Sequence, residues 1–157
     1  MKIASISENQ KVEKRIAITP EIAKKYISLG IEVSLPENYA SHLGFKNSEY
    51  IKFGVSILKD ENEIIKNADV IIQLGLLDND KISLLKDNQT FIGVLNPYDN
   101  DNKEKINDLI EKNINTFSLE LLPRITRAQS MDILSSQANL AGYKAVLESF
   151  AKFEKAI

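Results

Sequence analysis

One stretch near the carboxyl end of the chain gathers polar side chains suited to holding a small polar ring. It runs from Pro123 to Asn139 and directly follows an expected strand. In a helix, Gln129, Asp132 and Ser135 would lie on one face because they recur every three residues. Together with Arg124 they supply donors and acceptors, the mixture that a flat amide ring with ribose hydroxyls needs. A loop that enters a helix also offers free backbone N–H groups.

The same residues have a purely structural interpretation. Thr126 and Gln129 have the spacing of a capping box, and Asp132 would sit favourably against a helix dipole. Polar residues are common on an exposed first turn. From composition alone, both interpretations stay open.

A second candidate lies between Glu13 and Pro20, just after the first expected strand. Arg15 is suited to clamping a carboxylate or a phosphate, although a surface arginine in a charged loop is the alternative. His42, the only histidine, lies in a turn-rich loop and is expected to be solvated. No metal site is expected, because one histidine cannot form a histidine cluster and no HExxH pattern occurs.

Composition narrows the function classes. The chain has 157 residues, 43% hydrophobic and 27% charged, which is typical of a globular domain. Its formal charge of −2 argues against nucleic-acid binding through a basic surface. Cysteine is absent, so thiol chemistry is excluded. No apolar run approaches the ~20 residues of a membrane span. The six glycines never form a GxGxxG or P-loop pattern, so the usual pyrophosphate cradle is missing.

Short apolar runs alternate with segments of helical period. Six runs suit buried strands: Ile3–Ile6, Ile31–Leu35, Val55–Leu58, Val70–Leu74, Thr90–Leu95 and Ile114–Leu119. Four segments suit helices: one from Pro20 to just before Gly30 with Thr19 as N-cap, Glu61–Asn67, Asp80–Lys86 and Asn102–Lys112. The alternation predicts an α/β fold, a three-layer domain with a mostly parallel sheet. Ligands of such sheets bind at the carboxyl ends of the strands.

The pattern changes after residue 125. From Thr126 to Ile157 it predicts one long helical stretch that ends with Phe150 and Phe153 on an apolar surface. We therefore expect an α/β half-domain over residues 1–125 and a connector over residues 126–157. The alternative is that the helix folds back over its own sheet.

Two segments resemble the alanine dehydrogenase and proton-translocating transhydrogenase family. The residues from Lys14 to Pro20 resemble the family's RVAxTP signature. The run from Pro123 to Tyr143 is similar to the loop of the transhydrogenase alpha subunit that is named for its Arg, Gln and Asp. The likeness spans nearly the whole chain and implies a Rossmann-like fold. The family's activity is hydride transfer between NAD(H) and NADP(H), coupled to proton translocation.

The resemblance also implies roles for individual residues. Gln129 and Asp132 are the implied catalytic residues, and Gln129 would reach the ribose hydroxyls and the nucleotide on the facing NADP(H) component. NAD(H) would be bound by eight residues of this run: Arg124, Ile125, Thr126, Gln129, Ser130, Met131, Asp132 and Ser135. The carboxamide end of the nicotinamide would contact Arg124, Asp132 and Ser135.

The resemblance implies partners as well. A Rossmann NAD-binding domain would follow Ile157, and other components would bind NADP(H) and span the membrane. Whole subunits would form a homodimer on the cytoplasmic face of the inner membrane, peripheral to it through those components. The chain alone is expected to bind NAD(H) weakly and to be inactive.

Two other functions stay open. Alanine dehydrogenases have a catalytic histidine after the fifth strand, where this chain has Leu95 or Asn96, and a lysine in the fourth strand region, where it has Gln73. The missing histidine disfavours an amino-acid dehydrogenase fragment, whereas Gln73 does not discriminate, because some transhydrogenases have lysine there too. The third possibility is a non-catalytic interaction module of the same fold that docks a partner through its terminal helix.

Overall fold

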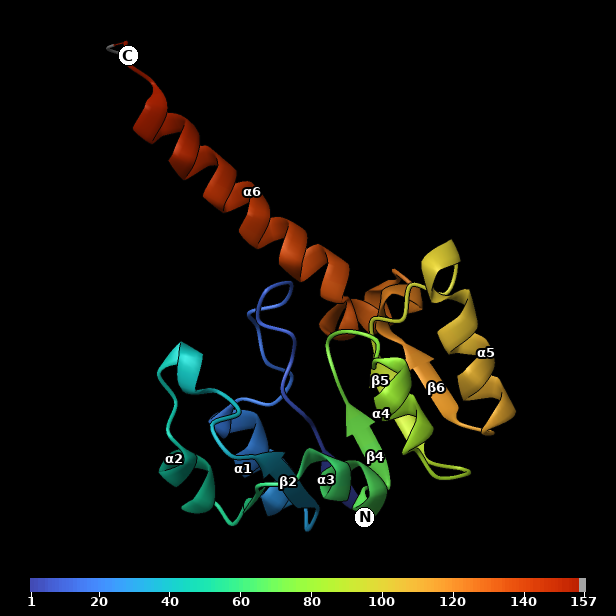
Figure 1. Cartoon of the computed structure of the whole chain (residues 1–157). Helices are drawn as coiled ribbons and strands as arrows, with labels where there is room; N and C mark the ends of the chain where they lie inside the picture. Colours follow the sequence, from blue (N-terminus) through green and yellow to red (C-terminus); the bar gives the residue numbers. More distant parts are fainter. Residues whose placement is uncertain (156–157) are drawn as a thin grey trace. The chain divides into compact units, whose positions relative to one another are not determined.

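Six short strands form one parallel sheet in the amino-terminal portion of the chain (Figure 1). The computed structural model describes residues 1–155, and the chain divides into two units between Ser118 and Leu119. The strands of the first unit are β1 (Lys2–Ala4), β2 (Glu32–Pro36), β3 (Ser56–Leu58), β4 (Val70–Ile72), β5 (Thr90–Gly93) and β6 (Asn115–Ser118). All six expected strands are confirmed, although most are shorter than their apolar runs.

The strand order places a topological switch beside the first strand. The order is β3-β2-β1-β4-β5-β6, so the chain builds outward from β1 on one side and then resumes with β4 on the other. In register, Ile3 pairs with Val33 of β2 and with Val70 of β4. At such a switch the loops after the two central strands diverge and leave a crevice where ligands bind.

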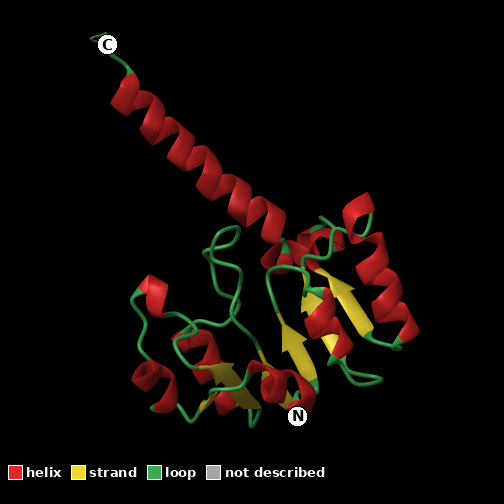
Figure 2. Cartoon of the chain, viewed as in Figure 1, coloured by secondary structure: helices red, strands yellow, loops and turns green. Residues whose placement is uncertain are grey.

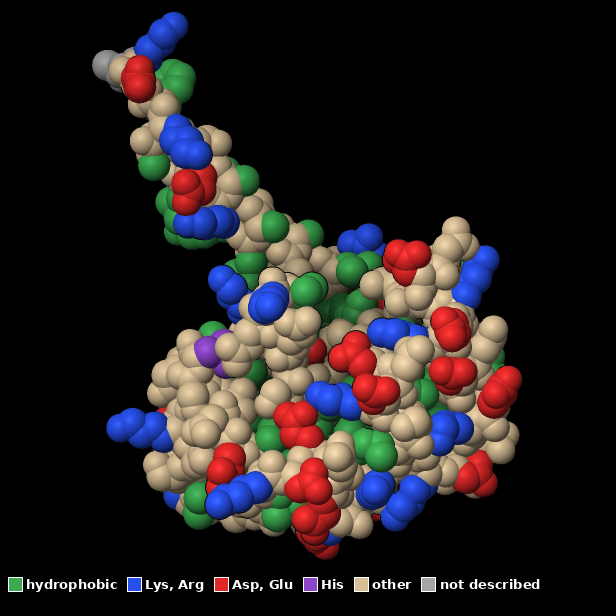
Figure 3. All heavy atoms as spheres, viewed as in Figure 1, with side chains coloured by type: hydrophobic (Ala, Val, Ile, Leu, Met, Phe, Trp, Pro, Cys, Tyr) green, Lys and Arg blue, Asp and Glu red, His purple; other side chains and the backbone are tan. Residues whose placement is uncertain are grey.

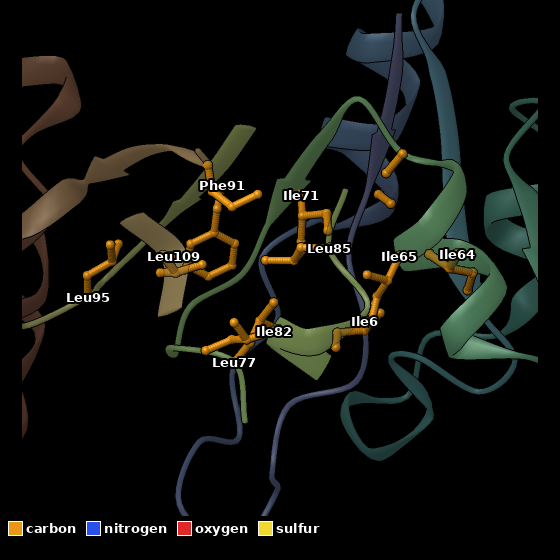
Figure 4. Packing of buried hydrophobic residues seen from close by; sticks show 13 residues of the cluster. Ile6, Ile64, Ile65, Ile71, Leu77, Ile82, Leu85, Phe91, Leu95 and Leu109 are labelled. Atoms are coloured by element: carbon orange, nitrogen blue, oxygen red, sulfur yellow. The ribbon is translucent and has the colours of Figure 1, made fainter. Parts of the chain in front are cut away.

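Helices cover both faces of this sheet (Figure 2). Ile3 belongs to a core cluster that includes Ala23 of α1 (Pro20–Ser28) and Tyr50 of α2 (Asn47–Ile51). Ala4 faces the opposite way, into a second cluster with the buried residues of α3 (Glu61–Asn67), α4 (Asn79–Ser83) and α5 (Lys103–Glu111) (Figure 4). The three-layer expectation is confirmed, because successive strand residues point to opposite faces.

Local signals explain both boundaries of α1. The side chain of Thr19 accepts a hydrogen bond from the backbone N–H of Ile22 at 3.4 Å, and Pro20 is the first residue of α1. Gly30 follows that helix with a φ of 76°, a conformation that glycine adopts without strain. Two elements of the first unit were not predicted, α2 and the 3₁₀ turn η1 (Ser41–Leu43), because each is shorter than two helical turns.

The second unit corrects the expectation of one unbroken helix from Thr126. It contains the 3₁₀ turn η3 (Leu119–Leu121), the 3₁₀ helix η4 (Thr126–Met131) and α6 (Ile133–Lys152). The break falls at Asp132, whose ψ of 91° is extended and whose side chain caps α6. Residues 156–157 of the expected helix lie outside the described residues. None of the helices described is both long enough and apolar enough to span a membrane.

Candidate functional site

Three of the expected site residues contact one another directly in the second unit. Arg124 Nη2 donates a hydrogen bond to Ser135 Oγ at 2.9 Å, and its Nε lies 3.4 Å from Asp132 Oδ2. Ser135 Oγ donates in turn to Asp132 Oδ2 at 2.7 Å. We call these three residues the Arg124 cluster.

The start of α6 holds this cluster in place. Asp132 is the N-cap residue, and its Oδ1 accepts the backbone N–H of Ser135 at 2.9 Å. The pKa of Asp132 lies below its usual value of 3.8, chiefly because the Ser135 hydroxyl and backbone N–H donate to it, with a further contribution from Arg124. The carboxylate therefore stays ionised at neutral pH beside the guanidinium. The capping box expected from Thr126 and Gln129 is wrong, because Ile125 occupies the N-cap position of η4 and no side chain caps it.

The 3₁₀ helix η4 presents the remaining expected residues. Ala128 is buried and its N–H donates to the carbonyl of Ile125 at 2.9 Å, which anchors the turn. Gln129 is exposed and joins the cluster only through its backbone carbonyl, which accepts the N–H of Asp132 at 3.3 Å. The other members of the expected set are also exposed: Ile125, Thr126, Ser130 and Met131.

Donors and acceptors thus alternate at the surface of the Arg124 cluster. The Arg124 side chain is 62% exposed, and its two contacts use two of the five N–H groups of a guanidinium. Asp132 and Ser135 contribute acceptors beside it. An amide group, which has one carbonyl oxygen and an NH₂, is complementary to such a mixture.

A separate cavity of about 710 Å³ lies within the first unit. Its walls are the loops after β1, β4 and β5, together with α3, α4 and the start of α5. It therefore occupies the crevice between β1 and β4 that the strand order predicts, and we call it the switch-point cavity.

Gln73 links the two central strands at the floor of this cavity. Its Oε1 accepts the N–H of Ile6 at 3.2 Å and the hydroxyl of Ser5 at 3.3 Å, and the side chain is 3% exposed. Ser5 Oγ also pairs with Tyr39 Oη at 2.9 Å, and Tyr39 accepts the N–H of Ala17 at 3.1 Å. This buried chain of hydrogen bonds fixes where the segment that carries Arg15 leaves the sheet.

Arg15 clamps a carboxylate, as its type suggested, but the carboxylate belongs to Glu13. Nε lies 2.9 Å from Glu13 Oε1 and Nη2 lies 2.6 Å from Oε2. The hydrogen bonds from Arg15 lower the pKa of Glu13. His42 is exposed, as expected, but it lies in the 3₁₀ turn η1, where its Nε2 is 2.7 Å from the carbonyl oxygen of Lys14.

Sequence reasoning missed the other charged groups of the switch-point cavity. Glu8 follows β1, and Glu61 pairs with Lys81 across the cavity wall at 2.9 Å. The prediction that ligands bind at the carboxyl ends of the strands includes the loops after β1 and β4, which line this cavity. It could not select Glu61 or Lys81, because these residues lie on helices whose orientation depends on tertiary packing. Within residues 1–155, no three acidic or histidine side chains converge as a metal site.

The curated relatives of the chain carry the same name in two organisms. A protein of Rickettsia prowazekii, named as the first part of NAD(P) transhydrogenase subunit alpha, is 41% identical over 160 residues, which covers 99% of this chain and 41% of the relative. The protein of the same name from Rhodospirillum rubrum is 34% identical over 161 residues, with the same coverage of each chain. The chain thus spans about two fifths of the length of these curated relatives.

Solved structures agree with the fold. A transhydrogenase from Sinorhizobium meliloti superposes with a TM-score of 0.86 at 37% identity, covering 98% of this chain and 46% of that one. An L-alanine dehydrogenase superposes with a TM-score of 0.71 at 15% identity, covering 76% and 32%, and this likeness concerns the fold alone. A family model described as "Alanine dehydrogenase/PNT, N-terminal domain" matches residues 5–141. Since that match covers most of its length, the chain belongs to the alanine dehydrogenase/PNT N-terminal domain family.

Proposed function

We propose that this chain is the NAD(H)-binding N-terminal portion of a transhydrogenase alpha subunit. In the complete assembly, hydride would pass between NAD(H) and NADP(H), coupled to proton translocation. Two findings support the proposal: the relatives named as transhydrogenase subunits, and the Arg124 cluster at the start of α6. The second is the observation that carries the site assignment.

The residues present fit the nicotinamide end of NAD(H). The guanidinium of Arg124 would donate to the carboxamide oxygen, while Asp132 and Ser135 would accept from its NH₂ group. NAD(H), when bound, supplies the hydride donor or acceptor. Ile125 and Met131 are 56% and 52% exposed and would provide apolar contact to a ring beside Thr126 and Ser130.

Hydride transfer between two nicotinamides requires aligned rings and little water rather than an acid or a base. The Arg124 cluster is suited to that positioning task because its members restrain one another. Gln129 makes no side-chain hydrogen bond to the residues described and is free to reach the ribose or the facing NADP(H) nucleotide.

The partners follow from the same proposal. A Rossmann NAD-binding domain would follow residues 126–157, which serve as the connector from the half-domain at residues 1–125. The NADP(H)-binding and membrane-spanning components would hold the subunit, as a homodimer, at the cytoplasmic face of the inner membrane. The 157-residue chain alone would not catalyse transhydrogenation.

An amino-acid dehydrogenase is the weaker alternative. Oxidation of an amino acid needs a proton acceptor, yet after β5 the chain has Leu95, which is 2% exposed, and Asn96. Neither side chain accepts a proton at neutral pH.

The assay is transhydrogenation by the whole alpha subunit with its partner components. We expect Asp132→Ala and Gln129→Ala each to lower the rate at least tenfold, since both act at the ring or its ribose. Lys144→Ala on α6 is the control, because Lys144 pairs only with Glu148 on the same helix among the residues described. Full activity of both site variants would refute the assignment.

A further inference from the structure

The side chain of His42 ties the long loop between β1 and α1 to the turn η1. Its Nε2 lies 2.7 Å from the carbonyl oxygen of Lys14, and its Nδ1 lies 3.2 Å from Nε2 of Gln10. Both ring nitrogens are therefore engaged, and both partners belong to the loop. All of these residues lie in the first unit, so the tie is independent of the function proposed for the Arg124 cluster.

The middle of this loop is shaped by contacts with itself. The N–H groups of Val12 and Glu13 both donate to the carbonyl of Asn9 at 2.9 Å, and the N–H of Arg15 donates to Glu13 Oε1 at 2.8 Å. Val12 is 84% exposed. Local turns define the shape of a segment but do not fix its position on the rest of the fold. The two hydrogen bonds of His42 join the segment to a separate element.

The two partners determine where the imidazole carries its proton. A carbonyl oxygen only accepts hydrogen bonds, so Nε2 donates to the carbonyl of Lys14. The NH₂ group of Gln10 only donates, so Nδ1 accepts through its lone pair. The arrangement therefore fits the neutral imidazole with its proton on Nε2.

A second proton on the ring is incompatible with this arrangement. Protonation turns Nδ1 into a donor that faces the NH₂ group of Gln10, so that hydrogen bond is lost. Among the residues described, no carboxylate forms an ion pair with the imidazole that would compensate for the new charge. Histidine is the side chain that changes its charge between pH 5 and 8, so a modest fall in pH is enough to cause this loss.

The segments that His42 joins carry other charged groups. The loop contains Glu8, Lys11, Glu13, Lys14 and Arg15, and Glu37 and Lys46 flank η1. Glu13 and Arg15 pair with each other at 2.6 Å. Burial raises the pKa of Glu8, so the titration of this carboxyl group has to be separated from that of His42 by experiment.

We propose that His42 is a pH-sensitive latch on the loop between β1 and α1. The neutral imidazole holds the loop against η1, and protonation releases Gln10 and loosens the loop. Asn9, Val12, Glu13 and Arg15 of the same loop line the switch-point cavity. The latch therefore controls how freely this part of the cavity wall moves.

The test is a pH titration of the ¹⁵N-labelled 157-residue chain from pH 8 to pH 5, measured at the imidazole nitrogens and at the loop amides. At pH 8 we expect the signals of a neutral ring with its proton on Nε2. As the pH falls, the amide signals of residues 10–15 should move with the same midpoint as the ring nitrogens. His42→Gln keeps an N–H for the Lys14 carbonyl but does not titrate, so its loop signals should stay close to their positions at pH 8.

Trypsin cleavage after Lys11 and Lys14 at pH 8 measures how firmly the loop is held. His42→Phe retains a ring without nitrogens, so the loop should be cleaved about threefold faster or more than in the wild type, because two hydrogen bonds are lost. Ser41→Ala is the matched control, since the Ser41 hydroxyl lies on the same turn and donates to Asn38 rather than to the loop. This variant should be cleaved at the rate of the wild type.

Four results would overturn the latch. A ring protonated on Nδ1 at pH 8 would contradict the hydrogen-bond directions, and loop amides that do not follow the imidazole would contradict the coupling. The same pH response in His42→Gln would assign that response to Glu8. Equal cleavage of His42→Phe and the wild type would mean that the loop is held by other contacts.

Discussion

Asp132 has two tasks at once. One oxygen caps α6 through the backbone N–H of Ser135, and the other accepts from the Ser135 hydroxyl and lies beside Arg124. Capping α6 is a local function that needs only a short side chain with a hydrogen-bond acceptor. The task of Asp132 in the cluster needs a negative charge. The two can therefore be separated by substitution.

Asp132→Asn should keep the helix, because asparagine caps as well as aspartate, whereas Asp132→Ala should lower helical content. Far-UV circular dichroism of the two variants measures this difference. Both should free Arg124, which can be followed as broadening or faster exchange of its Nε–H signal. Equal helical loss in both variants would mean that charge, and not capping, starts α6.

Glu8 and Glu61 line the same cavity, but removing the charge of each should have opposite effects on the stability of the protein. Burial raises the pKa of Glu8 above its usual 4.5, so its ionised form opposes folding at neutral pH. Burial also acts on Glu61, but hydrogen bonds from Lys81 and Ser7 outweigh it and lower the pKa, so ionised Glu61 favours folding.

We expect Glu8→Gln to be more stable than the wild type at pH 7 and Glu61→Gln to be less stable, by on the order of 1 kcal/mol. The advantage of Glu8→Gln should vanish as the pH falls below 4.5. The deficit of Glu61→Gln should be complete above pH 4.5, shrink as the pH falls below 4.5, and be lost once the pH has fallen through the lowered pKa of Glu61. Urea unfolding at a series of pH values measures both, and the same sign for the two variants would contradict the electrostatic account.

At the scale of elements, close contact between β4 and β5 sets the shape of the cavity floor. A Cβ atom at Gly93, the last residue of β5, would lie 2.5 Å from the carbonyl oxygen of Gln73. No real Cβ contact is that short, so any side chain there must move the backbone. Gly142 in α6 has no atom within 4 Å of such a position.

Gly93→Ala should therefore destabilise the first unit by about 1–3 kcal/mol, while Gly142→Ala should not destabilise it. Tyrosine fluorescence during urea unfolding reports mainly on the first unit, since the chain has no tryptophan and four of its five tyrosines, all except Tyr143, lie in that unit. An unchanged midpoint for Gly93→Ala would show that the strands separate easily at this point.

The elements also show how far the sequence alone can lead. Strands and long helices were predictable because buried apolar runs and caps such as Thr19 are local signals. The break at Asp132 was not, because an aspartate fits both a helix interior and a cap, and only the conformation of the preceding turn decides. Asp132 and Ser135 could be grouped with Gln129 from their spacing, and Arg124 was added because it lies in the same polar stretch, but Glu61 and Lys81 meet only through the packing of α3 and α4.

At the scale of the whole molecule, the two units differ in how far they bury their apolar side chains. The first unit buries two clusters, one on each face of the sheet. On the face shown in Figure 3, acidic and basic side chains intermix over this unit, in keeping with the small net charge. The helix α6 buries none of its residues, and Tyr143, Phe150 and Phe153 are each more than half exposed. This apolar surface supports the proposal that α6 connects to a further domain.

The most direct test of the proposed function is an NMR titration of the chain with reduced nicotinamide mononucleotide at millimolar concentrations. This ligand carries the nicotinamide and its ribose without the adenosine half. We predict shifts concentrated at residues 124–135 that disappear in Asp132→Ala and survive in Lys144→Ala. Shifts confined to other residues, or an unperturbed spectrum at saturating ligand, would contradict the claim that the Arg124 cluster holds the nicotinamide ring.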